Sequence, residues 1–338
     1  MRRAKQLFDR IPERANLLLA VQKALRGKRS KGDAKSYIAR LDENLNDLAG
    51  QLRSGDVRIG VCTEFTIYDP KERLITAPCF AERVLHHAIM NVCEPEFENR
   101  LIHHTYACRR GKGQFAALAA VSRFAGGREW FLKSDVRKYF ESVPKAGLMN
   151  RLDRVFAEDR LLELFSKILH AHRSGDERGL PIGSLISQHC ANLYLDPIDR
   201  HATSVLHCGS YVRYMDDFVA WSDRKDDLKT MRSALGAELD RLGLQFKIEP
   251  FLNRTRHGMD FLGHRVFSDR VILNRRSRLR FTERLNHLNA DLVAGRVDER
   301  EAQFRAEALC AFTERYGGAS FRRRAMVGNG CVPQVRTA

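Results

Sequence analysis

The sequence predicts an α+β fold in which helices pack on one face of an antiparallel sheet. Short runs rich in β-branched and aromatic residues occur within 62–78, 130–140 and 210–221, and long stretches of helical periodicity separate them. The chain has 338 residues, of which 43% are hydrophobic, so it can bury a large core. These observations exclude a wholly disordered protein.

The first elements follow from local patterns. Apolar residues recur at helical spacing over 15–26, and the predicted helix ends at Gly27, before a basic polar stretch. Two extended runs flank a DPKER turn within 62–78, which predicts a hairpin with basic side chains at its tip. Helical spacing then resumes over 81–97.

The C-terminal part differs in composition. From Arg270 onward the chain holds 14 Arg, no Lys and 7 Asp+Glu, which indicates a separate, basic, helical unit. We expect Ser277 to cap a first helix with an apolar face, and a second helix to follow. The apolar face of the first helix is formed by Phe281, Leu285, Leu288 and Leu292, and that of the second by Phe304, Ala308 and Phe312.

Charge and cysteine content limit the function classes. The formal net charge is +16, which favours a polyanion as partner but leaves a ribosomal, architectural or scaffold protein possible. The eight cysteines are scattered without a CxxC pair, so we expect free thiols and neither zinc nor disulfides. The basic N-terminus lacks a continuous apolar stretch, so we expect a cytoplasmic protein with no membrane partner.

Three carboxylates carry the predicted chemistry. Asp216 and Asp217 are adjacent between two extended runs, and an isolated pair of this kind is usually a solvated turn. Asp135 weakens that interpretation, because it is a single acid within an otherwise apolar and aromatic strand. Three carboxylates on neighbouring strands are costly to desolvate without cations. The pattern therefore predicts a site for two Mg²⁺ ions and nucleotidyl transfer.

A set of short motifs occurs in a fixed order along the chain, at Arg73–Ile75, Ala107–Gly113, Asp135 with Phe140, Gly179–Gly183 with Ser187 and Gln188, Tyr214–Asp217, Leu242–Leu244 with Lys247, and Gly258–Gly263. This ordered set resembles the motifs of the reverse transcriptases over about residues 61–267. Within that family, the CRRGKG and GLPIGSLISQ motifs are most similar to those of the reverse transcriptases of diversity-generating retroelements. The resemblance implies a right-hand polymerase with fingers, an antiparallel palm sheet with helices, and a helical thumb.

The resemblance implies roles for the carboxylates and for the nucleotide site. Asp135 and Asp216 are implied as the principal Mg²⁺ ligands, with Mn²⁺ as a substitute, whereas Asp217 points elsewhere and contributes mainly field or primer-end contacts. The implied dNTP-binding residues are Arg73, Lys71, Phe140, Ile182, Gly183 and Lys247. The alternative for Lys71 is a solvated turn lysine, for Phe140 an ordinary core ring, and for Lys247 a partly buried strand lysine. Arg73 suits the triphosphate because its planar donors match phosphate oxygens.

Other motifs imply contacts with template and primer. Cations in a glycine-rich loop approach a phosphodiester chain, and the FLG text belongs to a hairpin at the primer end. The alternative for the glycine-rich loop is a mobile surface loop, and the alternative for the FLG residues is a plain buried hairpin. The implied template-primer residues are Arg109, Arg110, Lys112, Ser187, Gln188, Tyr214, Phe261, Leu262 and Gly263.

The predicted organisation has four parts. We expect an N-terminal helical extension over 1–60, fingers and palm over 61–270, a basic helical thumb over 271–325, and a flexible tail over 326–338. Given this short C-terminal part, we expect no maturase or endonuclease domain after the thumb, an expectation that disfavours an intron enzyme.

Ile182 carries the narrower prediction. Many reverse transcriptases have a glutamine there, whose amide bonds near the incoming nucleotide; an aliphatic side chain implies relaxed fidelity, chiefly opposite template adenines. Packing beneath Pro181 is the alternative role for Ile182. The implied partners are template RNA, RNA–DNA hybrid, a small basic accessory protein and a structured retroelement RNA. The rival functions are a retron, group II intron-like or phage-defence reverse transcriptase, and a non-catalytic RNA-binding scaffold.

Overall fold

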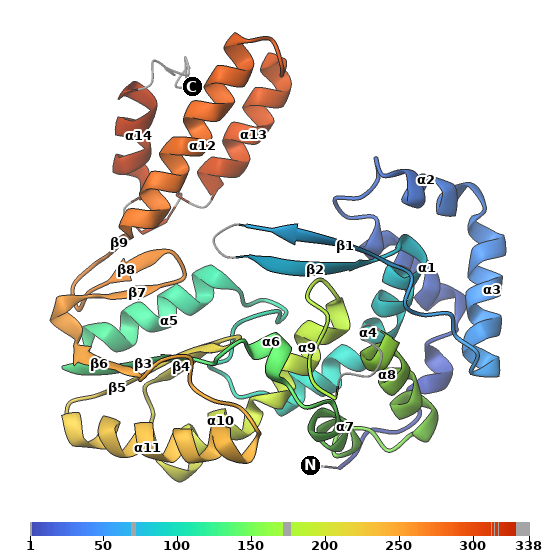
Figure 1. Cartoon of the computed structure of the whole chain (residues 1–338), viewed down its shortest axis with the longest axis horizontal. Helices are drawn as coiled ribbons and strands as arrows, with labels where there is room; N and C mark the ends of the chain where they lie inside the picture. The colour runs from blue at the N-terminus through green and yellow to red at the C-terminus, as the bar shows by residue number, and fades with distance from the viewer. Residues whose placement is uncertain are drawn as a thin grey trace.

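The computed structural model describes residues 2–68, 72–171, 177–311, 313, 315–316 and 318–328. Figure 1 shows a hand-like arrangement in which N-terminal helices and a projecting hairpin face a group of C-terminal helices across a central sheet. The strands form three sheets with the orders β1-β2, β4-β5-β3-β6 and β7-β8-β9. The predicted α+β class with antiparallel sheets is therefore confirmed.

The N-terminal part is helical and packs on the long helix of the fingers. Leu45, Leu48 and Leu52 recur on one helix face and are buried, as the apolar periodicity requires. The backbone at Ala4 also forms an isolated bridge with Phe156, which ties the N-terminus to the body of the molecule. The elements are η1 (Phe8–Arg10), α1 (Arg14–Ala24), α2 (Gly32–Ala39), α3 (Leu41–Ser54) and α4 (Phe80–Arg100).

The predicted hairpin of the fingers is present. Strands β1 (Cys62–Ile67) and β2 (Arg73–Pro78) pair antiparallel, and Ile67 lies opposite Arg73 nearest the turn. In Figure 1 this hairpin projects from the N-terminal helices toward the C-terminal ones. The predicted turn residue Lys71 lies outside the described residues.

The palm sheet is covered on both faces. Leu132 and Phe218 point into the main core, which helix α11 (Lys225–Arg241) covers, whereas Phe131 and Val219 point to the opposite face. The second face packs on α5 (Gln114–Gly126) and on the small sheet of β7 (Met259–Phe261), β8 (His264–Val266) and β9 (Val271–Leu273). The prediction of helices on one face only is therefore incomplete, because periodicity does not show which face a helix covers. The palm strands are β3 (Trp130–Asp135), β4 (Tyr211–Tyr214), β5 (Asp217–Ser222) and β6 (Phe251–Arg254).

Short helices complete the body below the hairpin. Helix α9 is the most central of them, because all but two of its ten residues are buried. These helices are α6 (Tyr139–Ser142), α7 (Lys145–Asp153), α8 (Asp159–Ala171), α9 (Leu185–Tyr194), α10 (Asp196–Arg200) and the π-helical turn η2 (His201–Val205), with the 3-10 turn η3 (Thr255–His257) after β6. Strand β3 ends at Asp135, so the predicted extended run over 130–140 continues as a helix.

Three helices form the C-terminal unit: α12 (Arg275–Val293), α13 (Glu299–Ala311) and α14 (Gly318–Gly328). The predicted apolar face of α12 is buried at Phe281 and Leu285, but Asn274 caps this helix in place of Ser277, whose amide donates to the Asn274 side chain. The prediction for α13 is wrong at Phe304, which is 68% exposed. Helix α14 reaches into the segment we expected to be a tail, of which residues 329–338 lie outside the described residues.

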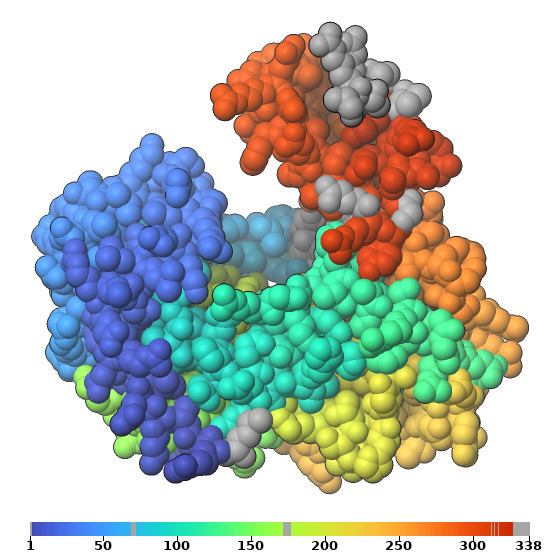
Figure 2. Space-filling view, turned by 180° about the vertical axis from the view of Figure 1, so that it is seen from behind, coloured from blue at the N-terminus to red at the C-terminus, as the bar shows by residue number. Residues whose placement is uncertain are grey.

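Figure 2 shows the molecule from behind, with an opening between the N-terminal residues in blue and the C-terminal helices in orange and red. The floor of this opening is formed by the middle of the chain, in teal and green. Among the helices in the described ranges, none combines the length and apolar character needed to cross a membrane.

Candidate active site

Asp216 lies at the tip of a tight hairpin in the palm. Tyr214 pairs with Asp217, so the loop between β4 and β5 consists of Met215 and Asp216 alone. Met215 has a φ of +57°, which two-residue hairpin turns of this kind require. The predicted pair of carboxylates is thus split, with Asp216 in the turn and Asp217 in the strand that follows.

Strand β3 brings the third carboxylate to the same place. Asp135 is the last residue of β3 and lies directly opposite Asp217 on β5. The side chain of Asp216 lies close enough to that of Asp135 for the two carboxyl groups to interact. Burial raises the pKa of Asp216, and the nearby Asp135 carboxylate raises it further because two like charges so close disfavour ionisation.

Two lysines partly neutralise this cluster. Lys247 forms an ion pair with Asp135, and its backbone amide donates to the Asp135 carbonyl at 2.9 Å. Lys133 donates to Oδ2 of Asp217 at 2.9 Å. Burial raises the pKa of Asp217 to about 6, although Lys133 acts in the opposite direction. Sequence reasoning missed Lys133; its position two residues before Asp135 on a strand was the available signal, since such residues share a face.

The donor set fits divalent cations, although the described residues contain no preassembled group of three or more His, Cys, Asp or Glu side chains that could hold one. One oxygen of Asp135 is paired with Lys247 and one oxygen of Asp217 with Lys133. Oδ1 of Asp217 is buried and has no hydrogen-bond partner within the residues the structure describes. Carboxylate oxygens are the ligands Mg²⁺ prefers, and a cation would relieve the repulsion between Asp135 and Asp216.

A buried ion pair supports the β4–β5 hairpin on its interior side. Arg213 and Asp199 are fully buried and are joined at 2.6 Å. The same guanidinium donates to the Met215 carbonyl at 2.8 Å and to the Asn192 side chain at 3.0 Å. Arg213 therefore fixes the turn that carries Asp216. The sequence analysis missed this network, because a charged residue inside an apolar strand shows neither its burial nor its partner.

Strand β2 of the fingers is bonded to the loop that holds Ile182. The Thr76 amide donates to the Ile182 carbonyl at 2.8 Å. Gly183 has a φ of +116°, and a Cβ there would stand 2.8 Å from the Thr76 carbonyl oxygen. This close approach requires glycine and fixes the loop against the hairpin. Arg73 is exposed at the first position of β2, on the turn side of the hairpin.

Phe140 contacts the loop that holds Ile182 through a backbone hydrogen bond. It lies in α6, its carbonyl accepts the Leu180 amide at 2.7 Å, and its half-buried ring packs on the main core. The ring meets Tyr139 edge to face at 5.8 Å. Phe140 is thus partly a core residue, as the alternative interpretation allowed, while one part of the ring remains accessible.

In the glycine-rich loop, Arg109 does not have the predicted role of a cation that faces a phosphodiester chain. That guanidinium is only 8% exposed and donates to Glu98 at 2.8 Å and to the Ile102 carbonyl at 2.6 Å. Its donors serve the protein, so Arg109 shapes the loop instead of offering cations to phosphate. Arg110 is exposed, and the half-buried Lys112 lies 4.9 Å from the centre of the Tyr106 ring.

The remaining residues of the predicted template-primer set lie on both sides of the palm. Ser187 is fully buried in α9, and the Cys108 thiol donates to the Gln188 amide oxygen at 3.3 Å. Tyr214 is half-buried at the end of β4 and packs against the second face of the sheet. Ser187 therefore contacts the protein interior, whereas Gln188 supports the glycine-rich loop.

The FLG text forms the hairpin that the sequence predicted. Phe261 pairs with His264, so Leu262 and Gly263 make a two-residue turn, with φ values of +45° and +79°. The Leu262 carbonyl accepts from Gln114 at 3.0 Å, which ties the turn to α5. Phe261 is buried, and the Lys133 ammonium lies 5.5 Å from its ring centre.

A basic hollow separates this hairpin from the C-terminal helices. It has a volume of about 880 Å³ and lies between the tip of the fingers at Tyr68, the β7–β8 hairpin at Asp260 and the first turns of α12. Arg275, Arg276 and Arg280 line it on the α12 side. Clustered arginines on one wall suit a phosphodiester backbone.

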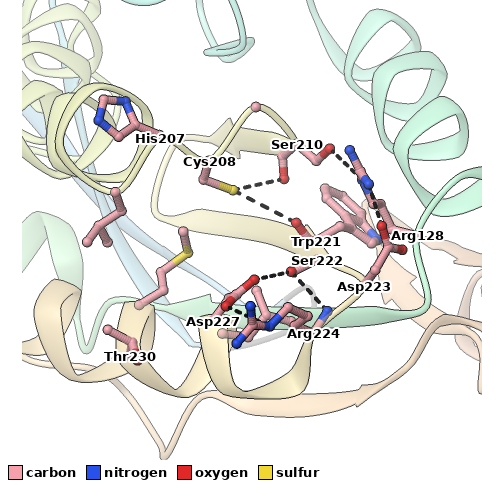
Figure 3. Close-up of a pocket in the computed structure, with 14 residues that line it drawn as sticks. Arg128, His207, Cys208, Ser210, Trp221, Ser222, Asp223, Arg224, Asp227 and Thr230 are labelled. Carbon is pink, nitrogen blue, oxygen red and sulfur yellow. Dashed lines mark hydrogen bonds and ion pairs between the residues drawn. The ribbon is translucent and has the colours of Figure 1, made fainter.

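A second hollow lies away from the carboxylates. It is a cavity of about 470 Å³ at the opposite end of β5 from Asp217. Figure 3 shows its lining residues, among which the Cys208 thiol donates to the Ser210 and Trp221 carbonyls. Arg128 pairs with Asp223 at its rim. None of the predicted site residues lines it.

An antiparallel palm sheet with carboxylates at one end, a projecting hairpin and a helical C-terminal unit define a polymerase of the right-hand class. The family model "Reverse transcriptase (RNA-dependent DNA polymerase)" matches residues 69–266, and the chain belongs to that family.

The chain is similar to intron-encoded proteins and to a telomerase. It is 25% identical over 163 residues to the "Uncharacterized 91 kDa protein in cob intron" of Schizosaccharomyces pombe, covering 46% of this chain and 19% of that protein. It is 23% identical over 138 residues to the "Group II intron-encoded protein LtrA" of Lactococcus lactis, covering 38% and 23%. Its fold resembles that of apo telomerase from Candida tropicalis, with a TM-score of 0.50, 13% identity, and coverage of 64% of this chain and 55% of that one. The matches thus span less than a quarter of the two intron-encoded relatives.

Proposed function

We propose that the protein is an RNA-templated DNA polymerase that binds two divalent cations, Mg²⁺ or Mn²⁺. The observation that carries the proposal is the convergence of Asp135, Asp216 and Asp217 at one end of the palm sheet. Membership of the reverse transcriptase family supports it. A protein that only bound RNA would gain nothing from three acids facing a polyanion, which argues against a non-catalytic scaffold.

The chain's own residues have distinct roles in this proposal. Asp135 and Asp216 hold the cations, and Asp217 contributes through its free Oδ1. Two Mg²⁺ ions, when bound, supply activation of the primer 3′-hydroxyl and neutralisation of the triphosphate charge. Lys247, next to Asp135, is placed to protonate pyrophosphate as it leaves.

The substrates follow from the positions of the remaining groups. Arg73, at the first position of β2, binds the triphosphate of a dNTP together with Lys71. The accessible part of Phe140 lies under the sugar, where it excludes a 2′-hydroxyl. Template RNA and the RNA–DNA hybrid lie in the opening between the fingers and the C-terminal helices. Arg110, Lys112 and the arginines of α12 neutralise their phosphates.

We further propose that the enzyme belongs to a diversity-generating retroelement. Ile182 supports this, since its side chain has no amide to bond near the incoming nucleotide. The proposal includes frequent errors opposite template adenines, a cytoplasmic location, and work with a small basic accessory protein and a structured RNA.

A second candidate is a group II intron-like function. The intron-encoded relatives from Schizosaccharomyces pombe and Lactococcus lactis favour it. A retron or phage-defence role is a third possibility. The genomic neighbourhood separates these candidates, because a nearby pair of repeats that differ mainly at adenines is expected only for the diversity-generating type.

Primer extension tests the proposed activity. The purified chain is given a DNA primer on a defined RNA template, with the four dNTPs and Mg²⁺ or Mn²⁺. We expect extension to the end of the template and none when the cation is chelated. Binding of the primer-template without any extension, in either cation, would instead favour the scaffold function.

A further inference from the structure

Lys133 occupies a central position in the palm. It lies on β3 between Val219 of β5 and Phe251 of β6, and it precedes Asp135 by two residues. Residues two apart on a strand share a face, so the Lys133 side chain projects from the same face as Asp135. Its side chain is 24% exposed.

The ammonium of Lys133 joins two sheets. It donates to Oδ2 of Asp217 on β5 at 2.9 Å and to the carbonyl of Asp260 on β7 at 2.7 Å. It also lies 5.5 Å from the ring centre of Phe261, the next residue of β7. One cation thus contacts both the strand that carries Asp217 and the hairpin that contains the Leu262–Gly263 turn.

These contacts restrict Asp217. Oδ2 is held by a charge-assisted hydrogen bond, which is stronger and shorter than a neutral one. Oδ1 remains buried and without a partner in the described part of the chain. The Asp217 carboxylate therefore has one orientation, with one oxygen committed and one available.

The same contacts restrict the β7–β8 hairpin. Among the described residues, β7 and β8 form a sheet with β9 and share no ladder with the palm strands. The hairpin is therefore held on the palm by the short connection through η3 and by contacts outside the ladders. The Lys133 bond to the Asp260 carbonyl is one of these contacts, and the same ammonium binds Asp217.

We propose that Lys133 is a positioning residue that holds the β7–β8 hairpin in register with the Asp217 carboxylate. A primer end resting on the hairpin then keeps a fixed position relative to the three carboxylates, because one ammonium binds both. The proposal rests on the polymerase function proposed above only for its catalytic consequence. The physical link between hairpin and palm can be tested in the protein alone.

The first test measures hydrogen exchange of the backbone amides of residues 259–266 in the full chain without metal. Lys133→Met keeps the length of the side chain and removes its charge and donors. We expect exchange in the hairpin to become at least about tenfold faster, because loss of the charge-assisted bonds makes local opening of the hairpin more favourable. Lys225→Met is the matched control, since Lys225 lies over Trp130 at the other end of the sheet.

The second test separates positioning from a general loss of structure. In single-turnover extension of a primed RNA template, Lys133→Met should lower the rate constant by about tenfold or more while changing the apparent KM for dNTP less than about twofold. Lys133→Arg should recover a large part of the rate, because a guanidinium can donate to both oxygens. Lys225→Met should behave as the unchanged protein.

Each outcome has a defined meaning. Unchanged hairpin exchange in Lys133→Met overturns the proposal, and so does faster exchange spread equally over β3, β5 and α11. If Lys133→Met does not fold, Lys133→Gln, which keeps a donor but no charge, is measured against the same expectations. If hairpin exchange is faster in Lys133→Met than in the unchanged protein, but the unchanged protein never extends a primer, the polymerase function is refuted. The link between hairpin and palm is then still established.

Discussion

Asp135 on β3 and Asp217 on β5 lie directly opposite each other in the palm sheet, so two carboxylates occupy a cross-strand position where like charges destabilise. Asp216 in the adjoining turn adds a third. Among the described residues, Lys247 forms an ion pair with Asp135 and Lys133 forms one with Asp217. Three neighbouring carboxylates destabilise the metal-free folded state, and such an arrangement is expected where function requires bound cations.

The first prediction concerns stability and pH. Asp217 has a pKa raised from 3.8 to about 6, and burial and Asp135 also raise the pKa of Asp216. The folded state therefore holds more protons than the unfolded state as pH passes from about 4 through 7, so the free energy of unfolding of the metal-free protein falls over that range. Above that range, the free-energy cost of burying the ionised carboxylates is fully present.

Thermal unfolding measures this effect. Mg²⁺ should raise the unfolding temperature more at pH 7.5 than at pH 5, because protons compete with the cation at the lower pH. In the absence of metal, Asp217→Asn should be more stable than the unchanged protein at pH 7.5, with a smaller difference at pH 5. An equal Mg²⁺ effect at both pH values would contradict the account.

The second prediction concerns the buried ion pair behind the turn. Arg213→Met leaves Asp199 charged and fully buried, so we expect a loss of about 3–5 kcal/mol in the free energy of unfolding, measured by urea denaturation. Arg128→Met is the matched control, because it breaks the more exposed pair with Asp223. Arg128→Met should lower the free energy of unfolding by less than about 1 kcal/mol. Equal losses in both variants would show that the burial of the Arg213–Asp199 pair does not increase its contribution to stability.

The third prediction concerns the choice of sugar. Phe140→Ala removes the ring proposed to lie beneath the incoming nucleotide, so incorporation of rNTP relative to dNTP should rise. Competitive single-nucleotide extension on one RNA template measures the ratio. A ratio that does not change in a folded variant would return Phe140 to a purely structural role in the core.

The fourth prediction concerns fidelity. An amide at position 182 can penalise a misaligned pair by leaving a polar group unpaired, an effect on the order of 1–3 kcal/mol, whereas isoleucine cannot. The unchanged enzyme should therefore make most errors opposite template adenines, and Ile182→Gln should lower that error rate. Sequencing of cDNA from both proteins on one template with all four bases gives the comparison. Adenines copied as accurately as other bases would remove the support for the diversity-generating assignment and favour the group II-like or retron function.

Much of the fold could be predicted from local sequence. The hairpins over 62–78 and 210–221 both occur, because β-like runs on either side of a turn leave clear local signals. The hairpin at Phe261–Gly263, which the resemblance implied, also occurs. The face that α5 covers and the exposure of Phe304 could not be predicted, because both depend on packing between distant elements.

The acids of the candidate site could be predicted from the sequence, but their partners could not. The sequence indicated Asp135, Asp216 and Asp217, since acids in apolar strands stand out. It did not indicate the partners of those acids, because the contact between Lys133 and Asp217 spans 84 positions of the chain. The burial of Arg109 was also hidden, as its partners are mostly backbone carbonyls that any sequence would supply.

The central claim is that Asp135 and Asp216 jointly hold the cations used for RNA-templated DNA synthesis. Asp216→Asn keeps the size of the side chain and removes one charge, and primer extension and RNA binding are measured on the same preparation. The account predicts loss of dNTP incorporation with RNA affinity nearly unchanged, because template binding relies on Lys and Arg contacts with phosphate. Incorporation that persists in Asp216→Asn, or RNA affinity lost in parallel with it, would contradict the account.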